Sequence, residues 1–253
     1  MKRPAWATQL LRALALVALS ALALQLVFAA RVALMIVVDP QSTSFQRSEA
    51  WRLLVEKQRI PWSQQWVPGV RISANLQRAV IASEDGGFAD HGGVDWDAIE
   101  KAWERNERAE ARAEALSKRA PARQGRPLVA KIVGGSTITQ QLAKNLFLSG
   151  ERTVLRKGQE LLITLMLEAL LGKGRILEIY LNNVEWGEGV FGAQAAARHY
   201  FRIDAAQLAP HQAARLAVML PAPKRFEKRP ASPYLLSRTA TIVARMNDVE
   251  LPK

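Results

Sequence analysis

A long apolar stretch near the N-terminus constrains this chain more than any other feature of its sequence. Residues 13 to 30 carry no charge, and apolar residues continue from 32 to 38 after Arg31. A helix needs about 20 such residues to cross the hydrocarbon core of a bilayer. We therefore predict a transmembrane anchor at residues 13–38.

Charges beside the anchor indicate its orientation. The basic residues before it are Lys2, Arg3 and Arg12. By the positive-inside rule they favour a cytoplasmic segment at 1–12 and an external remainder. Basic residues also follow the anchor and weaken this preference: Arg47, Arg52 and Lys57. The alternative is a cleaved signal peptide, but the apolar run is long and does not end in a small-residue cleavage site.

The charge balance points to an anionic partner. The chain has 253 residues, 49% of them hydrophobic, which is enough for the anchor and one domain with a substantial core. Its 35 Lys and Arg exceed its 23 Asp and Glu, and the net charge of +12 favours nucleic acid, acidic lipid headgroups or phosphates as partners. The absence of Cys excludes disulfides, thiol nucleophiles and Cys-based metal sites.

Helical periodicity dominates the rest of the chain. Residues 39–69 are polar and contain prolines, so we predict a stalk or linker there and a single domain at 70–253. No segment shows the sustained two-residue alternation of strands, and the fold class is therefore predicted to be all-α. The segment 155–171 is apolar on all sides, which predicts a central buried helix.

Two neighbouring carboxylates follow a predicted helix. Ser73 is a candidate N-cap, and the helix behind it stops at Asp85, so Glu84 lies at its C-terminus. A carboxylate at the negative end of a helix and beside another acid has a raised pKa, which suits a general base near neutral pH. A solvated C-cap turn has the same pattern, and for the pair alone it is the simpler interpretation.

Two further clusters combine cations with polar side chains. The segment Gly134–Asn145 leads from glycines into a helix N-terminus, where Thr137 starts a capping-box pattern. Its backbone N–H groups and Lys144 suit anionic oxygens, although a simple capped helix looks similar. Farther along, Arg156 and Glu160 share a helix face, and alone this spacing predicts a structural ion pair.

Two other patterns are set aside. Gly187, Gly189 and Gly192 match the dinucleotide fingerprint GxGxxG. That fingerprint follows a strand, whereas residues 176–181 have a helical pattern. The three His residues show no metal-ligand spacing, and structural roles are expected for them.

Several ordered motifs are more specific than any of these clusters alone. They are EDxxFxxHxG at Glu84–Gly93, GGSTITQQLAKN at Gly134–Asn145, RKGQE at Arg156–Glu160 and KGRILEIYLN at Lys173–Asn182, followed by GVFGAQAAARHYF and LPAPKRF. Together they resemble the family 51 peptidoglycan glycosyltransferases over roughly residues 75–226. Because no room remains for a transpeptidase domain, the chain resembles the monofunctional biosynthetic form, a peptidoglycan transglycosylase.

The resemblance implies a lysozyme-like helical fold and the polymerisation of lipid II, an undecaprenyl-pyrophosphate-linked disaccharide-peptide, into glycan strands. By its match, Glu84 is expected to deprotonate the acceptor hydroxyl, with Glu160 as a second catalytic acid. The residues expected to contact the donor pyrophosphate are Ser136, Lys144 and Arg152. The other expected substrate contacts are Asp85, Gln140, Asn145, Arg156 and Lys157. An inverting displacement needs such a base on one side of the sugar and cations on the other.

The resemblance also implies the cofactors, partners and cellular location of the enzyme. No cofactor or metal is required, and a dependence on divalent cations is left open. The expected partners are lipid II, the growing strand, the cytoplasmic membrane and other cell wall synthesis or division proteins, but not nucleic acid. The expected location is the bacterial inner membrane, crossed once, with the catalytic domain in the periplasm. The basic segment 109–131 is longer than in the family, and its role is open.

Two rival functions stay open at this level. A lytic transglycosylase or lysozyme-like hydrolase also uses a Glu beside a glycan, but it has no pyrophosphate to hold, so the two cation-bearing motifs argue against it. A membrane-tethered basic scaffold that binds acidic lipids needs no catalytic carboxylate. A substitution at Glu84 separates this scaffold from either enzyme.

Overall fold

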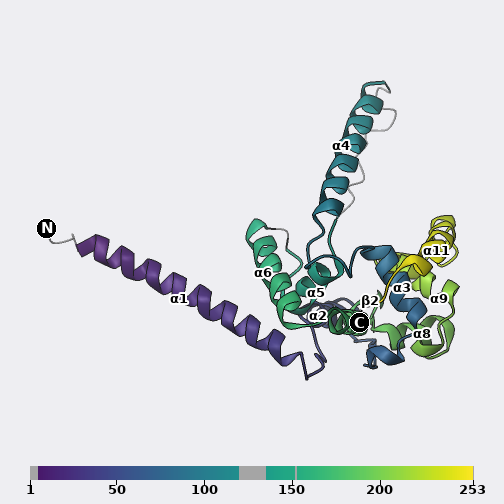
Figure 1. Ribbon diagram of the computed structural model, residues 1–253, viewed down its shortest axis with the longest axis horizontal. Coiled ribbons are helices and arrows are strands. Elements are labelled where there is room, and N and C mark those ends of the chain that lie inside the picture. Colours follow the sequence, from purple (N-terminus) through teal and green to yellow (C-terminus); the bar gives the residue numbers. More distant parts are fainter. Residues whose placement is uncertain (1–4, 120–134, 152, 253) are drawn as a thin grey trace.

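The computed structural model describes residues 5–119, 135–151 and 153–252, and most of them are helical (Figure 1). The predicted all-α class is confirmed. The helices are α1 (Ala5–Leu34), α2 (Ser44–Lys57), α3 (Ala74–Glu84), α4 (Trp96–Arg119), α5 (Ile138–Phe147), α6 (Val154–Leu170), α7 (Lys173–Asn183), α8 (Ala193–Phe201), α9 (Pro210–Met219), α10 (Pro223–Glu227) and α11 (Pro233–Arg245). The other described elements are the 3-10 turns η1 (Gly69–Arg71), η2 (Ala205–Gln207) and η3 (Met246–Asp248), and the strands β1 (Ser63–Gln64), β2 (Glu185–Gly187) and β3 (Val190–Phe191).

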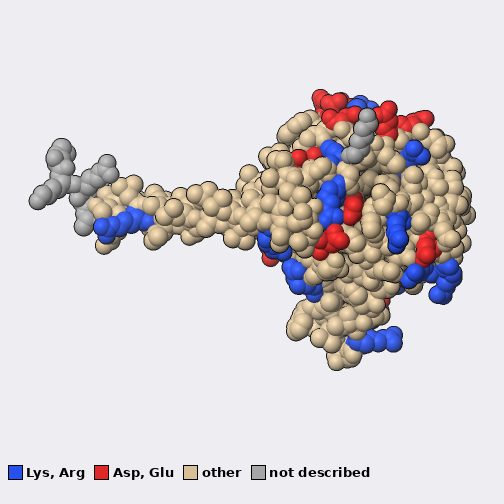
Figure 2. All heavy atoms as spheres, turned by 60° about the horizontal axis from the view of Figure 1, so that its bottom comes forward, with Lys and Arg blue, Asp and Glu red and all other residues tan. Residues whose placement is uncertain are grey.

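α1 leaves the body of the protein as an apolar rod with few charged side chains (Figures 1 and 2). Its segment Trp6–Leu34 contains an 18-residue stretch with a mean hydropathy of 2.3 and is long and apolar enough to cross a membrane. Its C-terminal part packs on the domain, because the side-chain amides of Gln25 and Gln159 exchange hydrogen bonds of 2.8 and 3.0 Å. Arg175 on α7 also donates to the carbonyl of Met35 at 2.9 Å. The rod is therefore joined to the domain by its last turns.

The segment 39–69 differs from the predicted linker. α2 begins behind a capping box of Thr43 and Gln46, and both side chains are buried. β1 then pairs in parallel with β3. At the β2–β3 turn Gly189 has φ 74°, and a Cβ there would lie 1.9 Å from the carbonyl oxygen of Pro61, so only glycine admits this approach. A polar stretch is thus held on the domain by capping and strand pairing, which hydropathy does not reveal.

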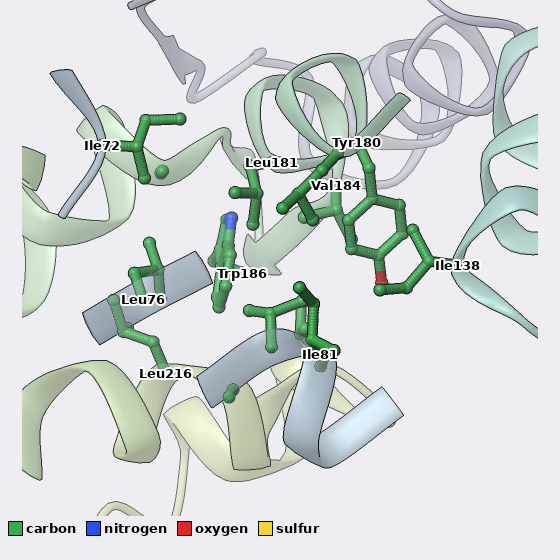
Figure 3. Close-up of a cluster of buried hydrophobic side chains, with 14 of the residues drawn as sticks. Ile72, Leu76, Ile81, Ile138, Tyr180, Leu181, Val184, Trp186 and Leu216 are labelled. Carbon is green, nitrogen blue, oxygen red and sulfur yellow. The ribbon is translucent and has the colours of Figure 1, made fainter. Parts of the chain in front are cut away.

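The core gathers around α7. Most of its side chains from Ile176 to Asn183 are buried. Figure 3 shows Tyr180 and Leu181 of α7 beside Trp186 of β2, with apolar residues of α3 and α9 completing the cluster. α5 and α6 contact α7, while α3, α9 and α11 pack against one another.

The prediction that 155–171 forms the central buried helix is wrong. α6 buries only one stripe of side chains, which includes Ile163 and Leu167, whereas Leu155 is 86% exposed and Leu162 is 45% exposed. A helix that is apolar on all sides is covered either by protein or by lipid, and periodicity does not distinguish the two. α1 packs beside α6, and much of the remaining apolar surface of α6 faces away from the described protein.

α4 projects from the body as an arm (Figure 1). Asp95 caps it, since its Oδ1 accepts from the N–H of Ala98 at 2.8 Å. Trp96 and Trp103, which helical spacing places on one face, are 70% and 67% exposed, so this aromatic face does not enter the core. The proline-bounded segment 121–127, for which the sequence predicts a loop, lies outside the described residues.

Candidate active site

A cleft of about 550 Å³ opens between α2, α5, the start of α6 and the side of the domain formed by β2 and α10. Its lining includes most of the residues that the motifs single out: Ser136, Gln140, Lys144, Asn145, Arg156, Lys157 and Glu160. The second and third motifs therefore meet in one cleft, as expected.

The N-terminus of α5 is fixed by the predicted capping box. Thr137 Oγ1 accepts from the N–H of Gln140, and Gln140 Oε1 accepts from the N–H of Thr137, both at 3.2 Å. The hydroxyl of Thr137 also donates to the carbonyl of Gly93 at 2.7 Å. Gly93 has φ 89°, and a Cβ there would lie 2.7 Å from a methyl of Thr164 on α6. These contacts hold the EDxxFxxHxG motif, which ends at Gly93, against the residues around Ser136.

The α5 and α6 walls of the cleft carry cations. Arg156 Nη1 lies 2.6 Å from Oε2 of the buried Glu160, and Lys157 contacts the other oxygen of the same carboxylate. The predicted ion pair is therefore confirmed. Arg156 also keeps a buried N–H, at Nε, that no described residue accepts. Together with the exposed Lys144 on α5, these donors suit the oxygens of a phosphate group.

Glu84 is the last residue of α3, as predicted, and is half-buried. Its Oε2 accepts a hydrogen bond of 3.0 Å from Gln141 Nε2. Burial raises the pKa of Glu84 and the charge of Asp85 raises it further, while the bond from Gln141 lowers it. The predicted direction is confirmed, with burial as the main cause and the neighbouring Asp85, which the sequence indicates, as a further one.

Tyr180 determines how Gln141 is oriented. Its hydroxyl donates to Gln141 Oε1 at 2.9 Å, so the amide nitrogen is the end that faces Glu84. Burial raises the pKa of Tyr180 well above its ordinary value, and the phenol keeps its proton. Gln141 also lines the cleft, and so it links the carboxylate of Glu84 to that space. No local sequence pattern marks Gln141 or Tyr180 as a partner of Glu84.

Asp85 is buried and is not part of the cleft lining. Its Oδ2 accepts from the backbone N–H of Ile138 at 2.9 Å, and its Oδ1 lies 2.8 Å from His91 Nε2. Burial raises its pKa, while His91 and the Ile138 N–H lower it. This position favours a role in holding the first motif against α5, and the predicted substrate contact stays a prediction.

Asp85, His91 and Asp95 bring their ligand atoms within 4.8 Å of one another, as a metal site would. His91 is already engaged on both ring nitrogens, because Nδ1 accepts from the N–H of Gly93 at 3.1 Å and Nε2 faces Asp85. A neutral imidazole bonded in this way has no lone pair left for a metal. We therefore assign these three side chains a structural role in the turn between α3 and α4.

Two parts of the cleft were missed by the sequence. α2 contributes Phe45, Ser48 and Glu49 to the lining, and β2 contributes Glu185. The local signal for α2 in the sequence is its N-terminal capping pair. That pair predicts a helix, but it does not predict that the helix lies beside the cleft. The predicted pyrophosphate contact Arg152 lies outside the described residues.

The fold and the site together define a class of protein. It is a helical enzyme in which a carboxylate at a helix end lies beside a cationic cleft, joined to an apolar helix able to cross a membrane. Comparison with known proteins gives the family.

The family model described as Transglycosylase matches residues 54–247, and the chain therefore belongs to that family. The chain is 53% identical over 231 residues to the biosynthetic peptidoglycan transglycosylase of Burkholderia thailandensis, covering 91% of this chain and 83% of that protein. It is 50% identical over 239 residues to the protein of the same name from Paraburkholderia xenovorans, covering 94% and 91%. A third such protein, from Bordetella avium, is 53% identical over 214 residues, covering 85% and 83%.

Proposed function

We propose that this peptidoglycan glycosyltransferase polymerises lipid II into glycan strands and releases undecaprenyl pyrophosphate. The observation that carries the proposal is the pairing of Glu84, held by Gln141 at the cleft, with the cations Lys144, Arg156 and Lys157 that line the same cleft. Glu84 itself does not line the cleft but is joined to it through Gln141, and a base beside a cleft that binds anions matches the two demands of glycosyl transfer from a pyrophosphate.

In the proposed reaction Glu84 takes the proton of the acceptor hydroxyl as its oxygen attacks the anomeric carbon of the donor strand. The bond from that carbon to the pyrophosphate breaks, and the leaving group departs with the bonding electrons. The cations stabilise the charge that grows on the leaving oxygen, which is where fixed donors lower a barrier most. Ser136 and Arg152 keep their predicted roles in this step.

Glu160 is also part of the proposal, as the second acid. It is buried, and its oxygens are paired with Arg156 and Lys157. These pairs hold both cations in place along the start of α6. Gln140 and Asn145, which line the cleft beside them, are proposed to contact the substrate through their amides.

The membrane is the second partner that we propose. A lipid-linked substrate stays at the bilayer, and α1 together with the exposed apolar side chains of α6 supports placing the cleft at that surface. We propose that α1 crosses the inner membrane once and that the domain lies in the periplasm. Protease added to intact spheroplasts should digest the domain, and its protection would contradict this orientation.

The proposed reaction is tested with purified full-length protein, lipid II and sizing of the product. Wild type should yield polymer, and Glu84→Gln should lower turnover by about 100-fold to 10,000-fold, the usual loss for a positioned base. Glu104→Gln, an exposed carboxylate on α4, is the matched control and should behave as wild type. Wild-type rates in folded Glu84→Gln, or cleavage of polymer without synthesis, would refute the proposal.

A further inference from the structure

Two carboxylates line the cleft from elements other than α5 and α6, which carry its cations. They are Glu49 of α2 and Glu185 of β2. Lys224 of α10 lies between them, with its Nζ 2.5 Å from Glu49 Oε2 and 3.3 Å from Glu185 Oε1. The cleft therefore has cations on its α5 and α6 walls and carboxylates on its α2 and β2 walls.

Glu185 is the unusual member of this group. Its side chain is only 8% exposed, and at its buried Oε1 the described residues offer only the Lys224 ammonium, 3.3 Å away and outside hydrogen-bonding geometry. The shorter contact of Lys224 goes to Glu49. A buried carboxylate without hydrogen-bond donors costs folding free energy, so such a group needs an explanation in the native protein.

The charges around Glu185 only partly compensate its burial. Burial raises the pKa of Glu185 and the charge of Glu49 raises it further; together they outweigh Lys224 and Arg52, which lower it, and the pKa reaches about 7. The carboxylate is thus short of hydrogen-bond donors while it faces a cleft large enough for a ligand.

We propose that Glu185 is a saccharide-binding residue, whose carboxylate accepts a hydrogen bond from an O–H or N–H of the donor glycan strand. The inference rests on the proposed function, because the donor strand reaches Glu185 only if its pyrophosphate lies among the cations that line the same cleft.

The surroundings of Glu185 select a neutral donor over a cation. Lys224 already places a positive charge 3.3 Å from Glu185 Oε1, so a second cation would gain less there than beside an unpaired carboxylate. A sugar offers O–H and N–H donors without charge, and a donor to a carboxylate makes one of the stronger kinds of hydrogen bond.

The test compares Glu185→Ala with wild type in lipid II polymerisation. The variant should raise KM about tenfold and shorten the product strands, while kcat stays within about twofold; a tenfold change corresponds to about 1.4 kcal/mol. Glu185→Gln keeps an acceptor oxygen but loses the titration. Its KM should stay constant between pH 6 and 8, whereas the wild-type KM should fall as pH rises through about 7.

Glu188→Gln is the matched control. Glu188 pairs with Arg52 and Lys57 in the neighbouring ion-pair group but does not line the cleft. It should leave KM and strand length unchanged, although it weakens the contact between α2 and the β2–β3 turn. A structural role for Glu185 would instead lower the melting temperature of Glu185→Ala and leave KM alone, and that result would overturn the inference.

A binding measurement separates this inference from the proposed function. Soluble glycan strands without lipid are titrated into the full-length protein and into Glu185→Ala, and the variant should bind about tenfold more weakly. If wild type polymerises lipid II but both proteins bind the strands equally, the inference alone fails. If wild type makes no polymer, the proposed function fails, and the difference in binding still decides whether Glu185 contacts saccharide.

Discussion

Replacing Gln141 with Met removes the amide N–H that donates to Glu84 Oε2 at 3.0 Å and leaves a side chain of similar length. That hydrogen bond favours the charged carboxylate, while burial and Asp85 oppose it. Without the bond the pKa of Glu84 should rise further. A base must be deprotonated to act, so the acid limb of the pH–rate profile should move to higher pH.

The size of the shift follows from the bond that is lost. A hydrogen bond to a charged group contributes about 1.5–3 kcal/mol, and one pKa unit corresponds to about 1.36 kcal/mol. The limb should therefore move upward by roughly 1–2 pH units in Gln141→Met. Tyr180→Phe keeps the amide but removes the hydroxyl that orients it at 2.9 Å, so it should shift the limb in the same direction by less.

The assay is kcat/KM for lipid II polymerisation between pH 5 and 9, with thermal unfolding of each variant at the same pH values. At high pH the variants should approach the wild-type rate, because Glu84 is then ionised in all of them. An acid limb that does not move in Gln141→Met would refute the assignment of Glu84 as the base held by Gln141. An equal loss of rate at every pH would show that Gln141 acts on substrate and not through Glu84.

Three other predictions follow from the described contacts. Lys144→Ala should raise the barrier by roughly 2–4 kcal/mol in steady-state turnover without lowering the melting temperature, if it acts on the leaving group. Gln25→Leu and Gln159→Leu, alone and together, should give a coupling of about 0.6–2 kcal/mol in detergent unfolding, because their amides pair; additive effects would count against a joined anchor. Glu84→Gln should gain stability over wild type as pH rises above 4.5, because ionising a carboxyl with a raised pKa costs stability. A pH-independent difference in unfolding would contradict that pKa.

The sequence by itself determined the local features of this protein. The apolar length of α1, the caps at Ser73 and Thr137, and the end of α3 at Glu84 each depend on neighbouring residues, and all of them appear in the structure. Backbone hydrogen bonding and side-chain periodicity act within a few turns of a helix, so they are visible in a single sequence.

Tertiary structure alone decided which distant residues meet. Gln141 reaches Glu84 across 57 residues and Tyr180 across 39, and no local pattern predicts either contact. The same is true of α2 beside the cleft, of Glu185 in its lining, and of α7 in place of α6 at the centre. An apolar face in the sequence predicts that those side chains will be buried. It does not predict which element buries them, because that depends on how the whole chain packs into one core.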